Sequence, residues 1–201
     1  MSYSQFKTIS SVKTAFNLTV VEGDRFLPEI EAIAPSPTLS GYLQESLPIV
    51  ATSGSEKARS EGIIYPMLLE VRRQLDRKVN LFSGEEFNVD ESVGLNGVCD
   101  FLLTRSTEIL EIEAPAVVVV EAKKTDLKTG IGQCMAEMVA AQRFNEMQNY
   151  LIPTIYGSVS NGIQWQFMKL VESILTIDLN VYSLPPVDRI LGYLVWMTRD
   201  Y

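Results

Sequence analysis

The sequence predicts one α/β domain with a mixed central sheet flanked by helices. Three observations favour this class. The segment Ala116–Lys123 is β-branched and almost wholly apolar, which is typical of a central strand buried on both faces. A long helical pattern, Thr129–Asn149, follows it directly. Further strand candidates stand before and after this pair, and a strand meander that crosses over through a helix indicates a mixed sheet.

The composition is that of a globular chain. It has 201 residues, of which 46% are hydrophobic, and a chain of this length suits one domain. We expect residues 1–54 to form an N-terminal extension packed on a core domain of residues 55–201. Cys99 and Cys134 both have apolar sequence neighbours, so we interpret them as reduced core residues.

Charge and residue content narrow the function classes. The net charge of −8 argues against a protein that coats nucleic acid non-specifically, because that affinity comes from neutralised phosphates. The absence of histidine excludes His-based triads, most zinc sites and imidazole acid–base catalysis. No targeting segment is evident, and the longest apolar run, Ala114–Val120, is too short for a bilayer. We therefore expect a cytoplasmic protein without a membrane partner.

The N-terminal elements are the hardest to assign. Residues Tyr3–Val21 are weakly patterned and are compatible with a short helix or a strand. Leu39–Ala51 resembles a short amphipathic helix that ends near Pro48. Ser55–Lys78 carries apolar residues at helical spacing, so it predicts a helix that Pro66 kinks or restarts.

The middle and C-terminal elements are predicted from the spacing of apolar residues and from turn sequences. The expected strands are Leu81–Val89, Val98–Thr104, Glu108–Glu113, Ala116–Lys123, Leu151–Val159, Ile163–Leu170 and Leu175–Tyr182. Asn161-Gly162 is a strong hairpin signal, and Val187–Met197 predicts a closing helix. Trp165 and Phe167 alternate on one face of their strand, so we expect both in the core.

Charged side chains interrupt the most apolar strands. Glu121 and Lys123 end the valine-rich strand and share one of its faces, because strand side chains alternate. Asp100 stands between Cys99 and Phe101 in another apolar strand. Burial of an unpaired carboxylate is costly, so Asp100 and Glu121 need a partner.

These residue types fit metal-assisted phosphate chemistry. Two carboxylates, Asp100 and Glu121, together with the strand carbonyl of Ala122, make a hard-oxygen site suited to Mg²⁺ or Mn²⁺. Lys123 beside that site can stabilise charge that develops on a phosphate or orient the attacking water. This combination supports phosphodiester hydrolysis without histidine.

The order of these motifs resembles a known superfamily. Gly97-Val98-Cys99-Asp100, then Val119-Val120-Glu121-Ala122-Lys123, then a helix that carries Gln133, is similar to the PD-(D/E)xK nucleases. The similarity covers roughly Ser55 to Tyr156. It looks closest to the N-terminal nuclease domain of type I restriction subunits and their stand-alone relatives, which also carry an Ile-Tyr-Gly strand, here Ile155-Tyr156-Gly157. One departure is Cys99, where the motif has proline.

The resemblance implies a restriction-endonuclease-like fold in residues 55–201 and Mg²⁺-dependent (or Mn²⁺-dependent) hydrolysis of DNA. It implies that Asp100 and Glu121 hold the metal, and that Lys123 orients water or stabilises the transition-state charge. Gln133 would support Lys123 or the water, and Glu61, with Glu56 as the alternative, would supply the helix glutamate. Related nucleases often pair, so a homodimer is a further expectation.

Plainer interpretations stand beside these. The domain could be a catalytically weak or inactive module for binding or assembly, or an enzyme for a small phosphate ester. Asp100 could pair with Arg105, and Gln133 could face solvent. Glu61 could pair with Lys57, four residues earlier. The basic helix residues Arg72, Arg73, Arg77 and Lys78 indicate a solvated face, whereas Lys124 and Lys128 are the better phosphate-contacting candidates.

Overall fold

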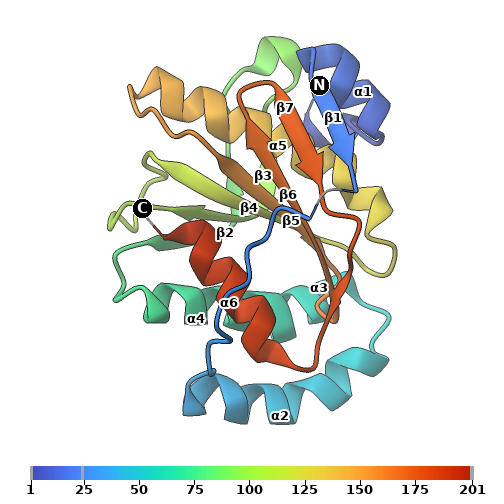
Figure 1. The fold of residues 1–201 in the computed structure, drawn as a ribbon, viewed down its shortest axis with the longest axis vertical. Coiled ribbons are helices and arrows are strands. Elements are labelled where there is room, and N and C mark those ends of the chain that lie inside the picture. The colour runs from blue at the N-terminus through green and yellow to red at the C-terminus, as the bar shows by residue number, and fades with distance from the viewer. Residues whose placement is uncertain (1, 24, 200–201) are drawn as a thin grey trace.

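The computed structural model describes residues 2–23 and 25–199, and it contains one eight-stranded mixed sheet (Figure 1). The order is β1-β7-β6-β5-β4-β3-β2, with β8 paired to β6. The β1–β7 and β4–β5 pairs are parallel and the other pairs are antiparallel. The strands are β1 Thr19–Glu22, β2 Asn80–Glu86, β3 Val98–Thr104, β4 Ala116–Ala122, β5 Ile155–Ser160, β6 Gln164–Val171, β7 Ile174–Ile177 and β8 Tyr182–Ser183. The predicted mixed α/β class is confirmed.

Helices cover both faces of the sheet. The α-helices are α1 Ile9–Phe16, α2 Pro37–Thr52, α3 Glu56–Arg59, α4 Tyr65–Gln74, α5 Lys128–Met147 and α6 Val187–Thr198; η1 Tyr3–Gln5 and η3 Glu91–Val93 are 3-10 turns, and η2 Ser60–Ile64 is a π-helical turn. Helices α1 and α5 lie on one face and α4 and α6 on the other, with α2 outermost (Figure 1). Within the described ranges, no helix combines the length and the apolar character that a bilayer span requires.

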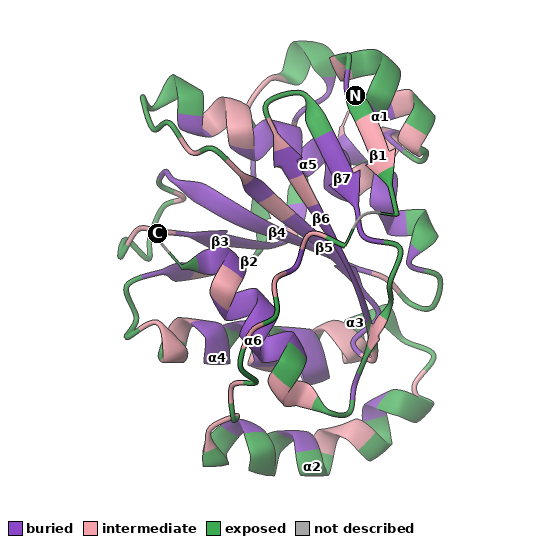
Figure 2. Cartoon of the chain, in the orientation of Figure 1, coloured by how far each residue is buried: buried purple, intermediate pink, exposed green. Residues whose placement is uncertain are grey.

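The central strand β4 separates two hydrophobic cores. All seven of its residues are buried, as the sequence predicts (Figure 2). Val119 packs in the core beneath α5, with Met135 and Met138. Val118 and Val120 face the other core, where Trp165 and Phe167 also pack. Both cysteines are buried free thiols, which confirms their assignment to the core.

Residues 1–54 contribute described side chains to the hydrophobic cores on both faces of the sheet. Strand β1 pairs in parallel with β7 at one edge of the sheet. Val12 and Leu18 are buried in the core beneath α5, whereas Leu39 and Leu43 are buried in the opposite core. Helix α2 continues past Pro48 to Thr52, so the prediction that it ends near Pro48 is wrong. Its last turn is stabilised by Thr52 Oγ1, which donates to Ile49 O at 2.9 Å.

Pro66 restarts the predicted helix as expected, through a π-helical turn. Helix α3 leads into η2, and α4 begins at Tyr65. Pro66 has no N–H to offer the carbonyl of Gly62, four residues earlier. Ser46 Oγ of α2 donates to that carbonyl at 2.9 Å instead. The local helical geometry therefore changes from α to π in front of the proline.

Two strand predictions are corrected. Residues Glu108–Glu113 form a loop between β3 and β4, and they pair with no strand of the described sheet. The predicted strand Leu175–Tyr182 is interrupted after Ile177. The buried side chain of Asp178 accepts from Asn180 N at 2.9 Å and from Tyr182 Oη at 2.8 Å, which forms a turn between β7 and β8.

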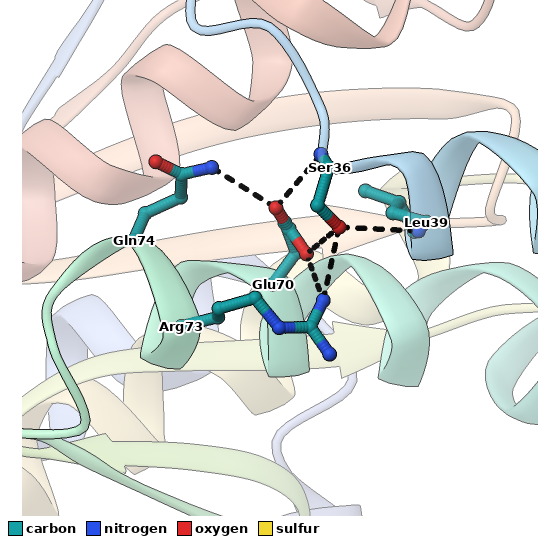
Figure 3. Close-up of polar contacts among 5 residues, drawn as sticks. All are labelled: Ser36, Leu39, Glu70, Arg73 and Gln74. Carbon is teal, nitrogen blue, oxygen red and sulfur yellow. Dashed lines mark hydrogen bonds and ion pairs between the residues drawn. The ribbon is translucent and has the colours of Figure 1, made fainter.

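A buried carboxylate fixes the start of α2 on α4 (Figure 3). Glu70 is fully buried and accepts from Ser36 N at 3.0 Å, Ser36 Oγ at 2.8 Å and Gln74 Nε2 at 2.9 Å, and it pairs with Arg73. Burial acts to raise the pKa of Glu70, but these hydrogen bonds together hold the pKa below its ordinary value. Arg73 itself is 42% exposed, in agreement with the predicted solvated face, and it reaches the buried Glu70 from that face.

Candidate functional site

Asp100 and Glu121 meet where β3 begins and β4 ends. The two strands pair from Thr104 with Ala116 to Phe101 with Val120, so the next positions along the antiparallel pair are Asp100 and Glu121. Asp100 Oδ2 accepts the backbone N–H of Ala122 at 2.8 Å. The alternative partner, Arg105, bonds the carbonyls of the C-terminal segment instead. The strand register therefore brings the two carboxylates together.

A connected network links Glu121 to α5. Lys123 Nζ donates to Glu121 Oε1, and this ion pair joins a side chain that is 17% exposed to one that is fully buried. Gln133 Nε2 donates to Glu121 Oε2 at 3.0 Å and to Glu137 Oε1 at 3.1 Å. The interpretation of Gln133 as a solvent-facing helix residue is therefore wrong, because its amide bridges two buried carboxylates.

The position of Lys123 depends on β5 and on a glycine of α5. Its backbone N–H donates to Ser160 O at 2.8 Å, directly after the β4–β5 ladder. Its alkyl chain passes over Gly130 in the first turn of α5. A Cβ built on Gly130 would lie 3.0 Å from both Cγ and Cε of Lys123 and 2.8 Å from Val159 Cγ1. Gly130 thus provides the room in which Lys123 reaches Glu121.

Burial and mutual repulsion dominate the electrostatics of the cluster. Burial, followed by the charge of Asp100, raises the pKa of Glu121 to about 8, although Lys123 acts against this shift. Burial also raises the pKa of Asp100. For Lys123, burial alone would lower the pKa, but the charge of Glu121 and its hydrogen bond raise it overall. The cluster therefore has more negative charge than one lysine balances.

Glu137 is a member of this network that the sequence interpretation missed. It is fully buried, and its Oε2 has no hydrogen-bond partner. Burial and the charge of Glu121 raise the pKa of Glu137 well above its ordinary value. The sequence feature that could have identified Glu137 is its spacing from Gln133. Glu137 lies four residues after Gln133 and so shares its helix face.

The two helix glutamates differ in their relation to the site. Glu61, the first choice from the resemblance, is exposed and pairs with Lys57 at 3.7 Å, which is the plainer interpretation. The charge of Glu56, at the start of α3, acts to raise the pKa values of Asp100, Glu121 and Lys123. Glu56 is therefore the better candidate for a carboxylate that is coupled to the cluster.

The donor set fits a hard divalent cation. In the described part of the chain, no group of three or more acidic, cysteine or histidine side chains is arranged to hold a metal. The available donors are therefore the two carboxylates of Asp100 and Glu121 and the carbonyl of Ala122, with water or substrate oxygens completing a coordination shell. Burial is the main cause of the raised pKa values of both carboxylates, and the charge of a bound cation would act to lower them.

The phosphate-contacting candidates lie on the chain immediately after the site. Lys124 and Lys128 are both exposed, and Lys128 begins α5. Near them, Asn161 Nδ2 donates to Thr125 O at 2.9 Å and Arg59 donates to Asn161 O at 3.1 Å. Arg59 and Asn161 line an open groove of about 710 Å³.

The chain matches no family model and shows no significant match to a curated protein. Within the molecule, hydrogen bonds join Lys123, Glu121, Gln133 and Glu137 in one network. Asp100 lies at the position opposite Glu121 in the strand register and accepts the backbone N–H of the adjoining Ala122.

Proposed function

We propose that this chain is a divalent-metal-dependent nuclease that hydrolyses phosphodiester bonds in DNA. The observation that carries the proposal is the hydrogen-bonded network of Glu121, Lys123 and Gln133, with Asp100 opposite Glu121 in the strand register. These residues come from β3, from the end of β4 and from α5, in the order of the PD-(D/E)xK motif. Strand termini and a packed helix hold them, so the geometry is set by the core rather than by a mobile loop.

Each residue has a role that follows from its contacts. Asp100 and Glu121, with the carbonyl of Ala122, would hold Mg²⁺ or Mn²⁺. Such a cation, when bound, polarises the phosphate and lowers the pKa of water. Lys123 keeps an ammonium group at the edge of the carboxylate pair, where it can meet the charge that develops on a phosphate oxygen. Gln133 restrains Glu121 through its amide N–H.

The surroundings of the site favour a polymer over a small phosphate ester. Lys124 and Lys128 are exposed next to the cluster and are free to contact the phosphates of a backbone. The groove lined by Arg59 and Asn161, whose Asn161 side chain bonds the carbonyl of Thr125 close to Lys124, is open rather than a closed pocket. Local basic residues of this kind can bind DNA despite the net charge of −8, which acts over longer distances and is screened by salt.

The test is a cleavage assay on linear, circular, branched and single-stranded DNA with Mg²⁺ or Mn²⁺. Lys123→Ala and Glu121→Gln should lose cleavage, whereas the exposed Lys13→Ala of α1 provides a matched control for loss of a lysine. Circular dichroism establishes that each variant is folded. Undiminished cleavage by Lys123→Ala would contradict the assignment of the site.

The same assay decides the alternative function. A folded wild-type protein that cleaves none of these substrates would support a nuclease-fold module for binding or assembly, which the acidic net charge motivates. Cleavage of a small phosphodiester, with none of DNA, would support the small-ester enzyme instead.

A further inference from the structure

Glu137 is a buried carboxyl group in α5, and no cation pairs with it among the described residues. Gln133 Nε2 supplies the hydrogen bond to its Oε1, and its Oε2 has no partner among the described residues. Burial of a polar atom without a hydrogen bond costs stability, so an apolar residue of similar size would be expected at a position that served packing alone. We therefore look for a role of the Glu137 carboxyl group other than packing.

The geometry around Gln133 indicates that role. A primary amide has two N–H donors, and here both point to carboxylates, one to Glu121 and one to Glu137. With the amide flipped, Nε2 would lose both of these acceptors, and the amide carbonyl would take its place beside them. Two acceptors on the same nitrogen therefore fix one orientation of the amide. In that orientation Oε1 is left as an acceptor, and no donor in the described residues bonds it.

We propose that Glu137 is a positioning residue that locks the amide of Gln133, so that Nε2 restrains Glu121 and Oε1 is available to accept a hydrogen bond from water at the site. This role rests on the proposed nuclease function for its effect on turnover. The locking of the amide itself is a property of the folded chain and does not depend on any activity. The spacing of four residues on one helix makes the contact intrinsic to α5.

The experiment compares Glu137→Met with Glu137→Gln. Methionine keeps the length and the helix propensity of the residue but removes the acceptor. Glutamine keeps an acceptor oxygen for Gln133 Nε2 and removes the charge. Two readouts are used: the ¹⁵N-labelled side-chain amide signals of Gln133, assigned with a Gln133→Met variant, and the kinetics of DNA cleavage. Thermal unfolding of each variant is measured in parallel.

We expect Glu137→Met to be at least as stable as wild type, to lose the exchange protection of one Gln133 amide proton, and to have a kcat roughly 10- to 100-fold lower with little change in KM. Glu137→Gln should retain the protected amide and most of the kcat. Unchanged amide signals in Glu137→Met would overturn the proposal, and so would a Glu137→Gln variant as inactive as Glu137→Met. If the wild type cleaves nothing, the nuclease assignment fails and the amide signals alone decide the positioning role.

Discussion

Asp100 Oδ2 accepts the backbone N–H of Ala122 across 2.8 Å, immediately beyond Phe101 and Val120, the last backbone pair of β3 and β4. The side chain thus takes the place of a main-chain acceptor at the end of the ladder. One oxygen of Asp100 is used by the fold, which leaves the other for a cation. The same carboxylate therefore links the geometry of the strands to the chemistry of the site.

Asp100→Asn and Asp100→Ala should separate these two roles. Asparagine keeps an acceptor for Ala122 N–H and removes a charge beside Glu121, so we expect stability equal to or above wild type and loss of cleavage. Alanine leaves the buried N–H of Ala122 without its acceptor, at a cost of about 1–3 kcal/mol. Denaturant unfolding measures the stability of both variants, and the DNA assay measures their cleavage. Cleavage retained by Asp100→Asn would contradict the role of Asp100 as a metal ligand.

The sequence was sufficient for the part of the site that lies on strands. Alternation along Ala116–Lys123 correctly places Glu121 and Lys123 on one face, and the buried ladder explains why Asp100 lies opposite Glu121. Glu137 could not be recognised in this way. Helix α5 is buried around most of its circumference, so its periodicity does not distinguish a face that contacts the site from one that contacts another layer.

The choice between Glu61 and Glu56 depends on a local feature that the sequence does not show. Glu61 lies inside the π-helical turn η2, where the number of residues per turn differs from that of an α-helix. The face that a residue of this segment occupies therefore cannot be counted from a regular helical period. The loop Glu108–Glu113 illustrates a third limit. Alternation indicates a local preference for strand, but a strand forms only where its backbone groups pair with a neighbouring strand, and Glu108–Glu113 pair with none of the described strands.

Gly130→Ala is expected to displace Lys123. The added Cβ would lie 3.0 Å from Lys123 Cε and 2.8 Å from Val159 Cγ1, so the lysine must move away from Glu121. Gly41→Ala in α2 is the matched control, because a Cβ there meets nothing within 4 Å. It should gain up to about 1 kcal/mol in unfolding free energy from helix propensity and keep full cleavage. We expect Gly130→Ala to cleave roughly tenfold more slowly, in line with a disturbed supporting contact. Equal rates for the two variants would show that Lys123 tolerates the added methyl group.

Glu56→Gln and Glu61→Gln should differ in cation affinity. The charge of Glu56 reaches Asp100, Glu121 and Lys123, whereas Glu61 is exposed and pairs with Lys57. We expect Glu56→Gln to weaken Mn²⁺ binding by roughly tenfold and Glu61→Gln to leave it unchanged. Isothermal titration of the metal-free protein measures both. The reverse order of effects would restore Glu61 as the helix glutamate.

Divalent cations should stabilise the folded chain through Asp100 and Glu121. A ligand that binds the native state alone raises the unfolding free energy in proportion to the logarithm of its concentration above Kd. Mn²⁺ should therefore raise the melting temperature of the wild type, and a chelator should reverse the shift and stop cleavage. Glu121→Gln should show no shift with Mn²⁺. An equal shift in Glu121→Gln would place the cation at another set of donors.

Glu70 should make the stability of the chain depend on pH in the acid range. Its hydrogen bonds to Ser36, Gln74 and Arg73 hold its folded-state pKa below the ordinary value of 4.5 (Figure 3). The stability contributed by the carboxylate is therefore fully present above pH 4.5, and it is lost as the pH falls through the lower, folded-state pKa. Glu70→Gln removes this titration, so its unfolding free energy should approach that of the wild type as the pH falls. Glu61→Gln, which alters an exposed carboxylate, is the control and should run parallel to the wild type. Urea unfolding across this range measures the three curves, and a constant difference between wild type and Glu70→Gln at all pH values would contradict the ionised state of Glu70.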